Sequence, residues 1–332
     1  MNRRVTFLSF SLLAALGYGA VAALPPPLTP VALPPQASIL PPKASFVAGI
    51  DFQRLVASTA YQRFKRESAT STRTDAMAEM EKRTGLDPER DISTFIVASD
   101  AAGASLSLIV GKFDKAKVET ALGATAGIST SEWKGRKIWK SDPSVVGQKD
   151  YAIALLGDGA LILGTSAEVE AGLDRQAAKG PGLTGNTAMQ ALLGRIEPGA
   201  TFWLAGDAGL NTAAGALAPQ AAGMMPSTKS LIITGDLDPD VRLAIIAEAA
   251  DDMAAKNMAD MVRALIGMVS MQAAQRPELK ELTSGIQISQ QGPEVRISAR
   301  VSHDTLARLQ AATPTPAPTP RPAARPRPAV TK

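Results

Sequence analysis

Side chains spaced for chemistry are few in this sequence, and the most distinctive set lies on one short stretch. Two tryptophans alternate there with four basic residues: Trp133, Lys134, Arg136, Lys137, Trp139 and Lys140. Aromatic faces and cationic tips on one hairpin can bind an anionic polymer, a lipid headgroup or a partner protein. The alternative is an edge hairpin with one buried tryptophan and solvated lysines, which also blocks aggregation through the edge. This stretch is the first candidate binding site.

The residue combinations typical of common enzymes are missing or misplaced. His303 is the only histidine, so a Ser-His-Asp triad would depend on it, and no Gly-x-Ser-x-Gly motif supplies the serine. Ser131 and Lys134 match Ser-x-x-Lys, but they fall on a predicted hairpin and not one helical turn apart. We predict no catalytic residue and no cofactor.

Four aspartates at comparable strand ends leave an enzyme as the alternative. They are Asp51, Asp100, Asp207 and Asp236. If they converge between two halves of the protein, they would suit a hydrolase with raised carboxylate pKa values. Aspartate is also common in turns and helix caps, which is the interpretation we favour. A small-molecule carrier with an apolar groove between the halves is a third possibility.

Two patterns resemble metal sites. Asp236, Asp238 and Asp240 alternate as in a calcium loop, but Val241 and Ala247 stand where that loop needs glycine and glutamate. We interpret them as a hairpin turn.

Five methionines follow one another along a predicted helix: Met253, Met258, Met261, Met268 and Met271. Their thioethers are soft ligands that suit Cu(I). Met258, Met261, Val262, Leu265 and Val269 also form an apolar stripe at helical spacing, which predicts core packing. We therefore predict no metal site.

The N-terminus has the features of an export signal. Arg3 and Arg4 precede a nearly apolar stretch over residues 5–23, and Ala20-Val21-Ala22 matches a signal-peptidase site. We predict a signal peptide over residues 1–22, the general secretory route, and a periplasmic or extracellular bacterial protein without a stable membrane span after cleavage. An uncleaved anchor is the alternative. The chain has no cysteine, which excludes disulfides, thiolate metal sites and an N-terminal lipid anchor.

Both ends are rich in proline. Residues 23–43 form a predicted linker, and residues 313–332 form a predicted disordered tail that carries Arg321, Arg325 and Arg327. Six of the 35 basic residues lie in the acid-free ends, so 29 face 31 acidic residues in the body. A body without a basic face argues against nucleic acid as a partner. The tail arginines are candidate contacts to an envelope protein or an anionic polymer.

The body divides into two halves with matching element order. Residues 44–180 and 181–312 each predict a strand, a strand pair, a helix, a hairpin and a closing helix. Helices are predicted over 51–67, 114–122, 251–271 and 303–311. The predicted fold is α+β: two similar halves with mostly antiparallel sheets, packed helices and disordered proline-rich ends. The sequence leaves the oligomeric state open.

Four stretches resemble an uncharacterised family of exported bacterial proteins from acidobacteria-like genomes: Thr84–Ile92, Gly111–Asp114, Trp133–Arg136 and Met224–Gly235. The likeness spans about Ala44 to Ala311 and rests on turns and core strands. It implies a duplicated α+β body and no known activity. The sequence as a whole predicts an exported, non-enzymatic binding or scaffolding module of the cell envelope.

Overall fold

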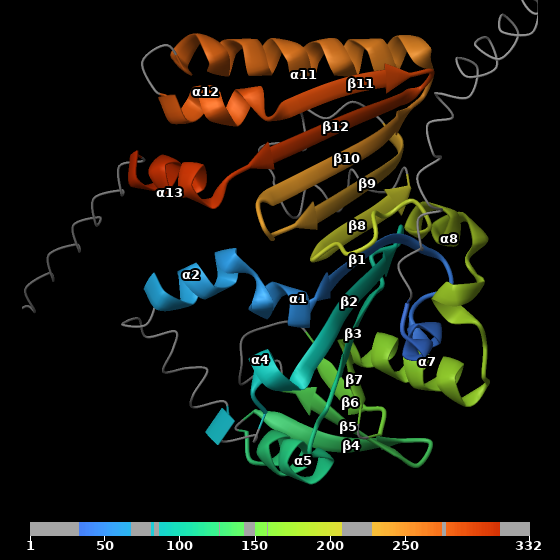
Figure 1. Ribbon diagram of the computed structural model, residues 1–332. Helices are drawn as coiled ribbons and strands as arrows, with labels where there is room; N and C mark the ends of the chain where they lie inside the picture. Colours follow the sequence, from blue (N-terminus) through green and yellow to red (C-terminus); the bar gives the residue numbers. More distant parts are fainter. Residues whose placement is uncertain are drawn as a thin grey trace, which may run out of the picture.

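The computed structural model describes residues 33–67, 81–82, 86–125, 127–142, 150–157, 159–207, 228–273 and 277–312. They form one twelve-stranded sheet with helices on both faces (Figure 1). All of its strand pairings are antiparallel. The fold is therefore α+β, as the sequence predicts. The predicted signal peptide and the tail over 313–332 lie outside the described residues.

The strands, in chain order, are β1 (Ala44–Asp51), β2 (Ile92–Asp100), β3 (Ser105–Gly111), β4 (Ile128–Trp133), β5 (Arg136–Ser141), β6 (Ala152–Leu155), β7 (Ala160–Gly164), β8 (Phe202–Asp207), β9 (Thr228–Asp236), β10 (Val241–Ala249), β11 (Ile286–Gln291) and β12 (Glu294–Val301).

The α-helices are α1 (Phe52–Ala57), α2 (Thr59–Glu67), α4 (Pro88–Asp91), α5 (Lys115–Gly123), α7 (Ser166–Ala177), α8 (Thr187–Leu193), α11 (Asp252–Gln272), α12 (Pro277–Ser284) and α13 (His303–Ala312). Two 3-10 helices, η1 (Pro35–Ile39) and η2 (Gly182–Gly185), accompany them.

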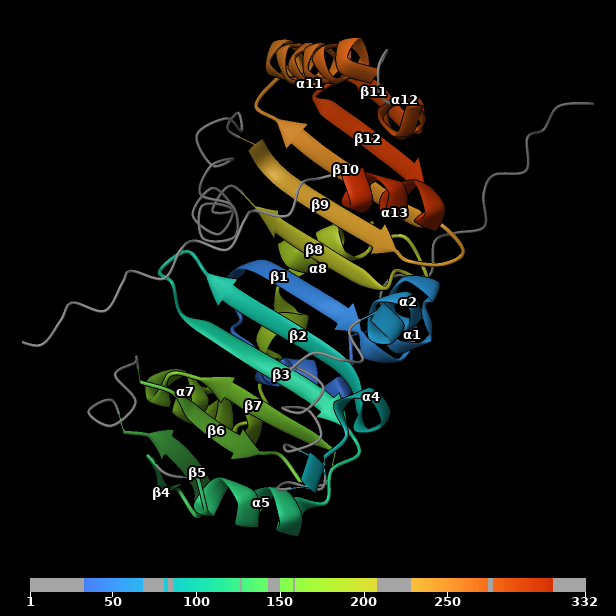
Figure 2. The same ribbon diagram turned by 90° about the vertical axis from the view of Figure 1, so that its left-hand side faces the viewer.

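The two halves of the chain use the same strand order and meet at one pair of strands. The order across the sheet is β11-β12-β10-β9-β8-β1-β2-β3-β7-β6-β5-β4. Read outward from the β1–β8 junction, each half gives three consecutive strands and then a hairpin whose second strand lies inward (Figure 2). The hairpin β4–β5 is an addition at the edge of the first half. A common origin of the halves stays a prediction.

The larger core lies on the face of the sheet covered by α7 and α8. Val47, Ile96 and Leu108 point from the strands into this core, where they join Leu173 of α7 and Met189 of α8. All five side chains are buried. Alternate strand residues are buried here because successive side chains of a strand point to opposite faces.

The N-terminal part of α11 forms a smaller core on the opposite face. Ala255, Met258 and Ala259 pack with Ala247 of β10 and Val295 of β12. Farther along the same helix Met261 and Leu265 are 37% and 39% exposed, so the predicted core stripe along α11 is wrong beyond its first half. The hydrophobic pattern of the sequence continues after the sheet contacts have ended.

The packed body begins before the predicted boundary at Ala44. Helix η1 lies inside the predicted linker, yet its Ala37 and Ile39 belong to the larger core. The Nε of Arg175, on α7, donates to the carbonyl oxygen of Ile39 at 2.7 Å. Buried apolar side chains and this long-range hydrogen bond fix a proline-rich segment that composition alone assigns to a linker.

Aspartate caps three of the helices, and one predicted helix is divided. The carboxylates of Asp51, Asp114 and Asp251 accept hydrogen bonds from the first turns of α1, α5 and α11. The predicted helix over 51–67 breaks at Ser58, whose backbone is extended. The Ser58 hydroxyl donates to the carbonyl of Leu55 at 2.7 Å, and it accepts from the amide of Tyr61.

We predict that Gly49→Ala destabilises the protein by about 1–3 kcal/mol, because the added methyl group overpacks a finished core. Gly49 of β1 faces Trp203 of β8, and a Cβ atom at Gly49 would lie 2.3 Å from the indole. Urea unfolding measures the change.

Gly123→Ala is the matched control, since a Cβ atom there meets no atom within 4 Å. It is expected to leave the free energy of unfolding unchanged or slightly raised. Equal effects of the two substitutions would contradict the assigned role of Gly49.

Candidate functional site

The predicted tryptophan hairpin is held between two helices. On one side Lys137 donates to Glu119 of α5 at 2.8 Å. On the other side Lys134 donates to Asp174 of α7 at 2.8 Å. Two further contacts reach α7, from Lys140 to Glu170 at 2.8 Å and from Arg136 to Gln176 at 2.7 Å.

Both tryptophans of the hairpin face the protein body. Trp139 is only 2% exposed. Trp133 is half-buried against the larger core, and its indole Nε1 donates to Asp174 at 3.0 Å. The ammonium group of Lys134 lies 5.2 Å from the Trp133 ring centre, and that of Lys137 lies 5.6 Å from the Trp139 ring centre. The aromatic surface is therefore used for packing.

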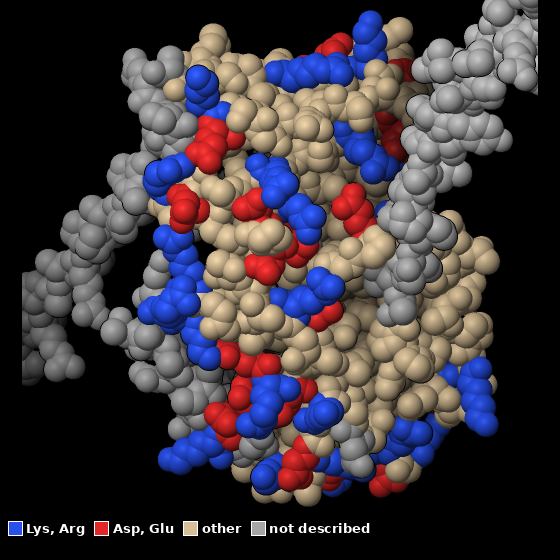
Figure 3. Space-filling model, in the orientation of Figure 1, with Lys and Arg blue, Asp and Glu red and all other residues tan. Residues whose placement is uncertain are grey.

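Carboxylates that are distant in the sequence neutralise much of the hairpin's positive charge. Lys134, with its hydrogen bond to Asp174, holds the pKa of that carboxyl below its usual range, and the Trp133 indole adds to the effect. Basic and acidic side chains also intermingle on the face shown in Figure 3. Binding by the hairpin stays a prediction, and so do the contacts of Arg321, Arg325 and Arg327, which lie outside the described residues.

The four strand-end aspartates do not converge. Asp51 and Asp236 lie at one end of the sheet, where the backbone amide of Asp51 donates to the Thr201 carbonyl and the Thr201 hydroxyl donates to the Asp236 carboxylate. Asp100 and Asp207 lie at the other end, as the pairing of β1 with β2 and β8 shows. Asp100 accepts two backbone amides of its own turn. The four aspartates therefore lie as two pairs at opposite ends of the sheet and do not form one common site.

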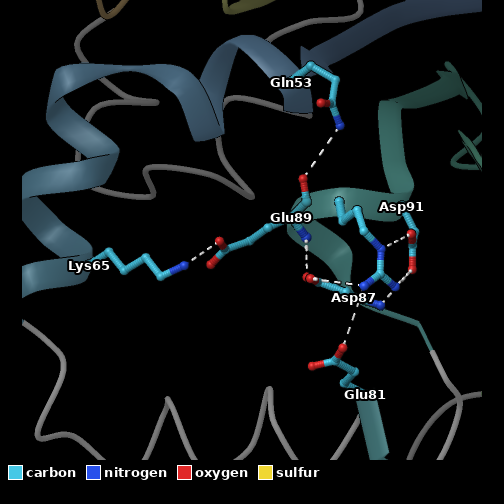
Figure 4. Close-up of polar contacts among 7 residues, drawn as sticks. Gln53, Lys65, Glu81, Asp87, Glu89 and Asp91 are labelled. Atoms are coloured by element: carbon cyan, nitrogen blue, oxygen red, sulfur yellow. Dashed lines mark hydrogen bonds and ion pairs between the residues drawn. The ribbon is translucent and has the colours of Figure 1, made fainter.

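A polar network joins α2 to α4. Glu89 of α4 accepts a hydrogen bond from Tyr61 at 2.8 Å. It also accepts one from Lys65 at 2.5 Å (Figure 4). The Lys65 hydrogen bond lowers the pKa of Glu89. Burial, together with the Glu89 contact, raises the pKa of Tyr61 to about 12. Arg90 beside it contacts Asp91 at 2.7 Å. All these groups are paired, so the network stabilises the α2–α4 contact.

A groove lies at the end of the sheet where Asp236 is found. Its volume is about 240 Å³. Strands β9 to β12 form its floor, and the segment from Glu197 to Ala200 forms a wall. Thr234 pairs in register with Trp203 on one side and with Ala244 on the other, and Ala244 pairs with Ser298. These residues therefore lie on one face of the sheet, the face that α7 and α8 cover elsewhere.

Two arginines lie side by side in this groove. Arg242 of β10 is directly opposite Arg300 of β12. Arg242 donates to Asp236, and Arg300 donates to Asp240 through Nε at 2.8 Å and forms an ion pair through Nη2 at 2.7 Å. Burial alone would raise the pKa of Asp236, but hydrogen bonds from Arg242 and Thr201 outweigh it and hold that pKa below its usual value.

Uncharged and acidic side chains complete the groove. Glu197, Gln287 and Ser298 line it, and no side-chain hydrogen bond or ion pair among the described residues engages them. Sequence reasoning missed this site, apart from Asp236 and Asp240. Its parts lie on four strands and a loop, and only the register of the sheet brings them together. The alternation of polar and apolar residues in Glu294–Val301 was the one available signal.

The remaining candidates are placed as follows. Asp236, Asp238 and Asp240 form the turn between β9 and β10, as predicted. The Nε2 of His303 is buried without a hydrogen-bond partner among the described residues. In that same part of the chain, no group of three or more His, Cys, Asp or Glu side chains is arranged to hold a metal ion. None of the described helices is both long and apolar enough to cross a membrane.

Comparison with known proteins gives a fold and no family. No family model and no curated protein matches the chain. A crystal structure of TP0453, crystal form III, is similar over 85% of this chain and 99% of its own, with a TM-score of 0.50 and 9% sequence identity. Crystal form I of TP0453 gives a TM-score of 0.48 at 9% identity, covering 85% and 98% of the two chains. At this identity the likeness concerns the fold alone.

We predict that Glu89→Gln lowers stability by about 1–2 kcal/mol at neutral pH, since it weakens a charged hydrogen bond. Glu89 has a lowered pKa in the folded state, so its contribution is present above the ordinary glutamate pKa and lost as the pH falls below it. The variant should therefore lose less stability than the wild type between about pH 5 and pH 3. Urea unfolding at several pH values measures both effects.

Glu81→Gln serves as the control, because Glu81 is half-exposed and lies 3.8 Å from Arg90. Its stability profile is expected to follow that of the wild type. A Glu89→Gln profile parallel to that of the wild type across the acidic range would contradict the role assigned to Glu89.

Proposed function

We propose that this protein is a non-enzymatic binding module of the bacterial cell envelope, and that its groove holds a small zwitterionic ligand. The ligand class is one that carries a carboxylate and an ammonium group, as amino acids and short peptides do. The opposed pair Arg242 and Arg300 is the observation that supports this proposal. The envelope location rests on the predicted signal peptide.

Placing two arginines opposite each other destabilises the fold electrostatically, and packing gives no reason for this arrangement. Like charges directly opposite each other in an antiparallel pair are destabilising. Asp236 and Asp240 offset this repulsion, yet each guanidinium has five N–H donors and the contacts to the aspartates engage only part of them. Arg242 and Arg300 are 54% and 66% exposed, so the other donors can reach a ligand. Guanidinium groups suit carboxylates because two donors match two oxygens.

The charges around the groove favour a zwitterion over a simple anion. The two arginines are already balanced by Asp236 and Asp240, and Glu197 adds a further negative charge on the wall. An anion alone would leave Glu197 without a partner, whereas an ammonium group would pair with it. Gln287 and Ser298 can exchange hydrogen bonds with an amide or hydroxyl group of the same ligand.

The size of the groove limits the ligand. Sites for drug-sized molecules measure about 300–1,000 Å³. A groove of about 240 Å³ suits a molecule the size of an amino acid or a dipeptide.

Isothermal titration of the whole protein with a panel of ligands tests the proposal. We expect dipeptides or amino acids to bind, and acetate or a simple alkylamine alone to bind much more weakly. Arg300→Gln and Glu197→Gln should each weaken binding by about 10- to 100-fold, as expected for the loss of a charged hydrogen bond.

Arg296→Gln is the matched control. Arg296 lies on the same strand as Arg300 and is 48% exposed, but it pairs with Glu294 and does not line the groove. Its affinity should equal that of the wild type. If no zwitterion binds, or if all three variants lose affinity equally, the groove is not the site.

A further inference from the structure

Helix α11 packs on the sheet with its first half, whereas its second half contacts α12. Its first three turns bury Ala255, Met258 and Ala259 against the sheet. From Met261 to Met271 every residue is exposed or half-exposed. Figure 1 shows the helix crossing above β11 at the end of the sheet, with α12 near its C-terminal end. The second half of α11 therefore presents side chains that the core does not use.

Four of the five methionines of α11 are exposed, three of them from Met261 onward. Met253, Met261, Met268 and Met271 are 67%, 37%, 50% and 74% exposed. Only Met258 is buried, at 6% exposure. Core packing accounts for methionine at one position of five, so another reason is needed for the rest.

Met268 and Met271 are spaced to bind one ion together. Residues three apart on a helix are neighbours, with Cβ atoms about 5–6 Å apart. The methionine side chain is unbranched and has three rotatable bonds, so two sulfur atoms can meet from such positions. Met261 lies two turns before Met268, about 10 Å along the axis, and Met253 lies farther still. Neither can share that ion.

The electrostatic surroundings of Met268 and Met271 favour a cation. No charged residue occurs from Ala264 to Gln272. Arg263, the nearest basic residue on the helix, pairs with Asp260 at 2.8 Å. Met271 is one residue from the helix C-terminus, where the helix dipole places partial negative charge.

The sequence offers few other side chains that bind soft metal ions. The sequence has no cysteine and a single histidine, His303. Thioethers are therefore the principal soft ligands that this protein offers. Soft sulfur ligands select Cu(I) over the harder divalent ions that prefer carboxylates.

We propose that Met268 and Met271 form a thioether site for Cu(I) at the C-terminal end of α11. The two sulfur atoms bind the ion without any change in its oxidation state, and exogenous ligands complete its coordination. The site is separate from the groove, which lies on the other face of the sheet, and it does not depend on the function proposed for the groove.

An apolar docking surface is the other use of exposed methionines, and one substitution separates the two. Leucine has nearly the same size and hydrophobicity as methionine but lacks the sulfur atom. Met268→Leu with Met271→Leu therefore preserves an apolar surface and removes a thioether site. The two side chains are exposed, so a volume-conserving exchange leaves the fold intact.

The test is competition of the whole protein with a chromophoric Cu(I) chelator under reducing, oxygen-free conditions. The wild type is expected to take up one Cu(I) that is lost in the double variant, with affinity reduced more than about tenfold. The matched control, Met253→Leu with Met261→Leu, should bind as the wild type does. Ag(I) added to protein with labelled methionine methyl groups should shift two signals, those of Met268 and Met271.

Three results would overturn the proposal. The first is no Cu(I) uptake by the wild type in competition. The second is unchanged uptake by the Met268→Leu, Met271→Leu variant. The third is an equal loss in both double variants. The labelled wild type decides the question even if a variant misfolds, because a shift of other methyl signals would place the ion elsewhere.

Discussion

The pairing of β1 with β8 is the contact on which the rest of the structure depends. It joins strands from the two halves, and without it the twelve-stranded sheet would be two separate sheets. The close approach of Trp203 to Gly49 belongs to this junction, since any larger residue at Gly49 would displace the indole. One aromatic ring lying over one glycine thus fixes how two similar strand sets share a continuous core.

The distribution of helices over this sheet determines where polar chemistry can occur. Helices α7 and α8 cover one face from β5 to β9, and the alternate residues of those strands are apolar there. Among the described residues, this core extends on β10 only to Ile246, and Arg242, Ser298 and Arg300 occupy the same face beyond it. The groove is therefore a consequence of a helical layer shorter than the sheet.

Local signals in the sequence predicted local structure well. The interpretation of Asp51 as a helix cap is correct, and the order of predicted strands and helices predicted the α+β class. Long-range effects escaped prediction. The partners of the tryptophan hairpin come from α5 and α7, and the groove is assembled by cross-strand register. Neither spacing along the chain nor composition encodes which carboxylate meets which cation.

The exposed end of α11 shows why an apolar pattern alone does not locate a core. Met258 and Met261 are three residues apart and follow the same helical periodicity, yet Met258 is buried and Met261 is not. The difference is that the sheet face below α11 supplies Ala247 and Val295 only under its first turns. Hydrophobic residues beyond the last packing partner leave apolar surface exposed to water, which is unfavourable in free energy. At Arg242 and Arg300 the unfavourable term is charge repulsion. Neither the exposed end of α11 nor the arginine pair is explained by folding, and this is the reason for seeking a ligand at each.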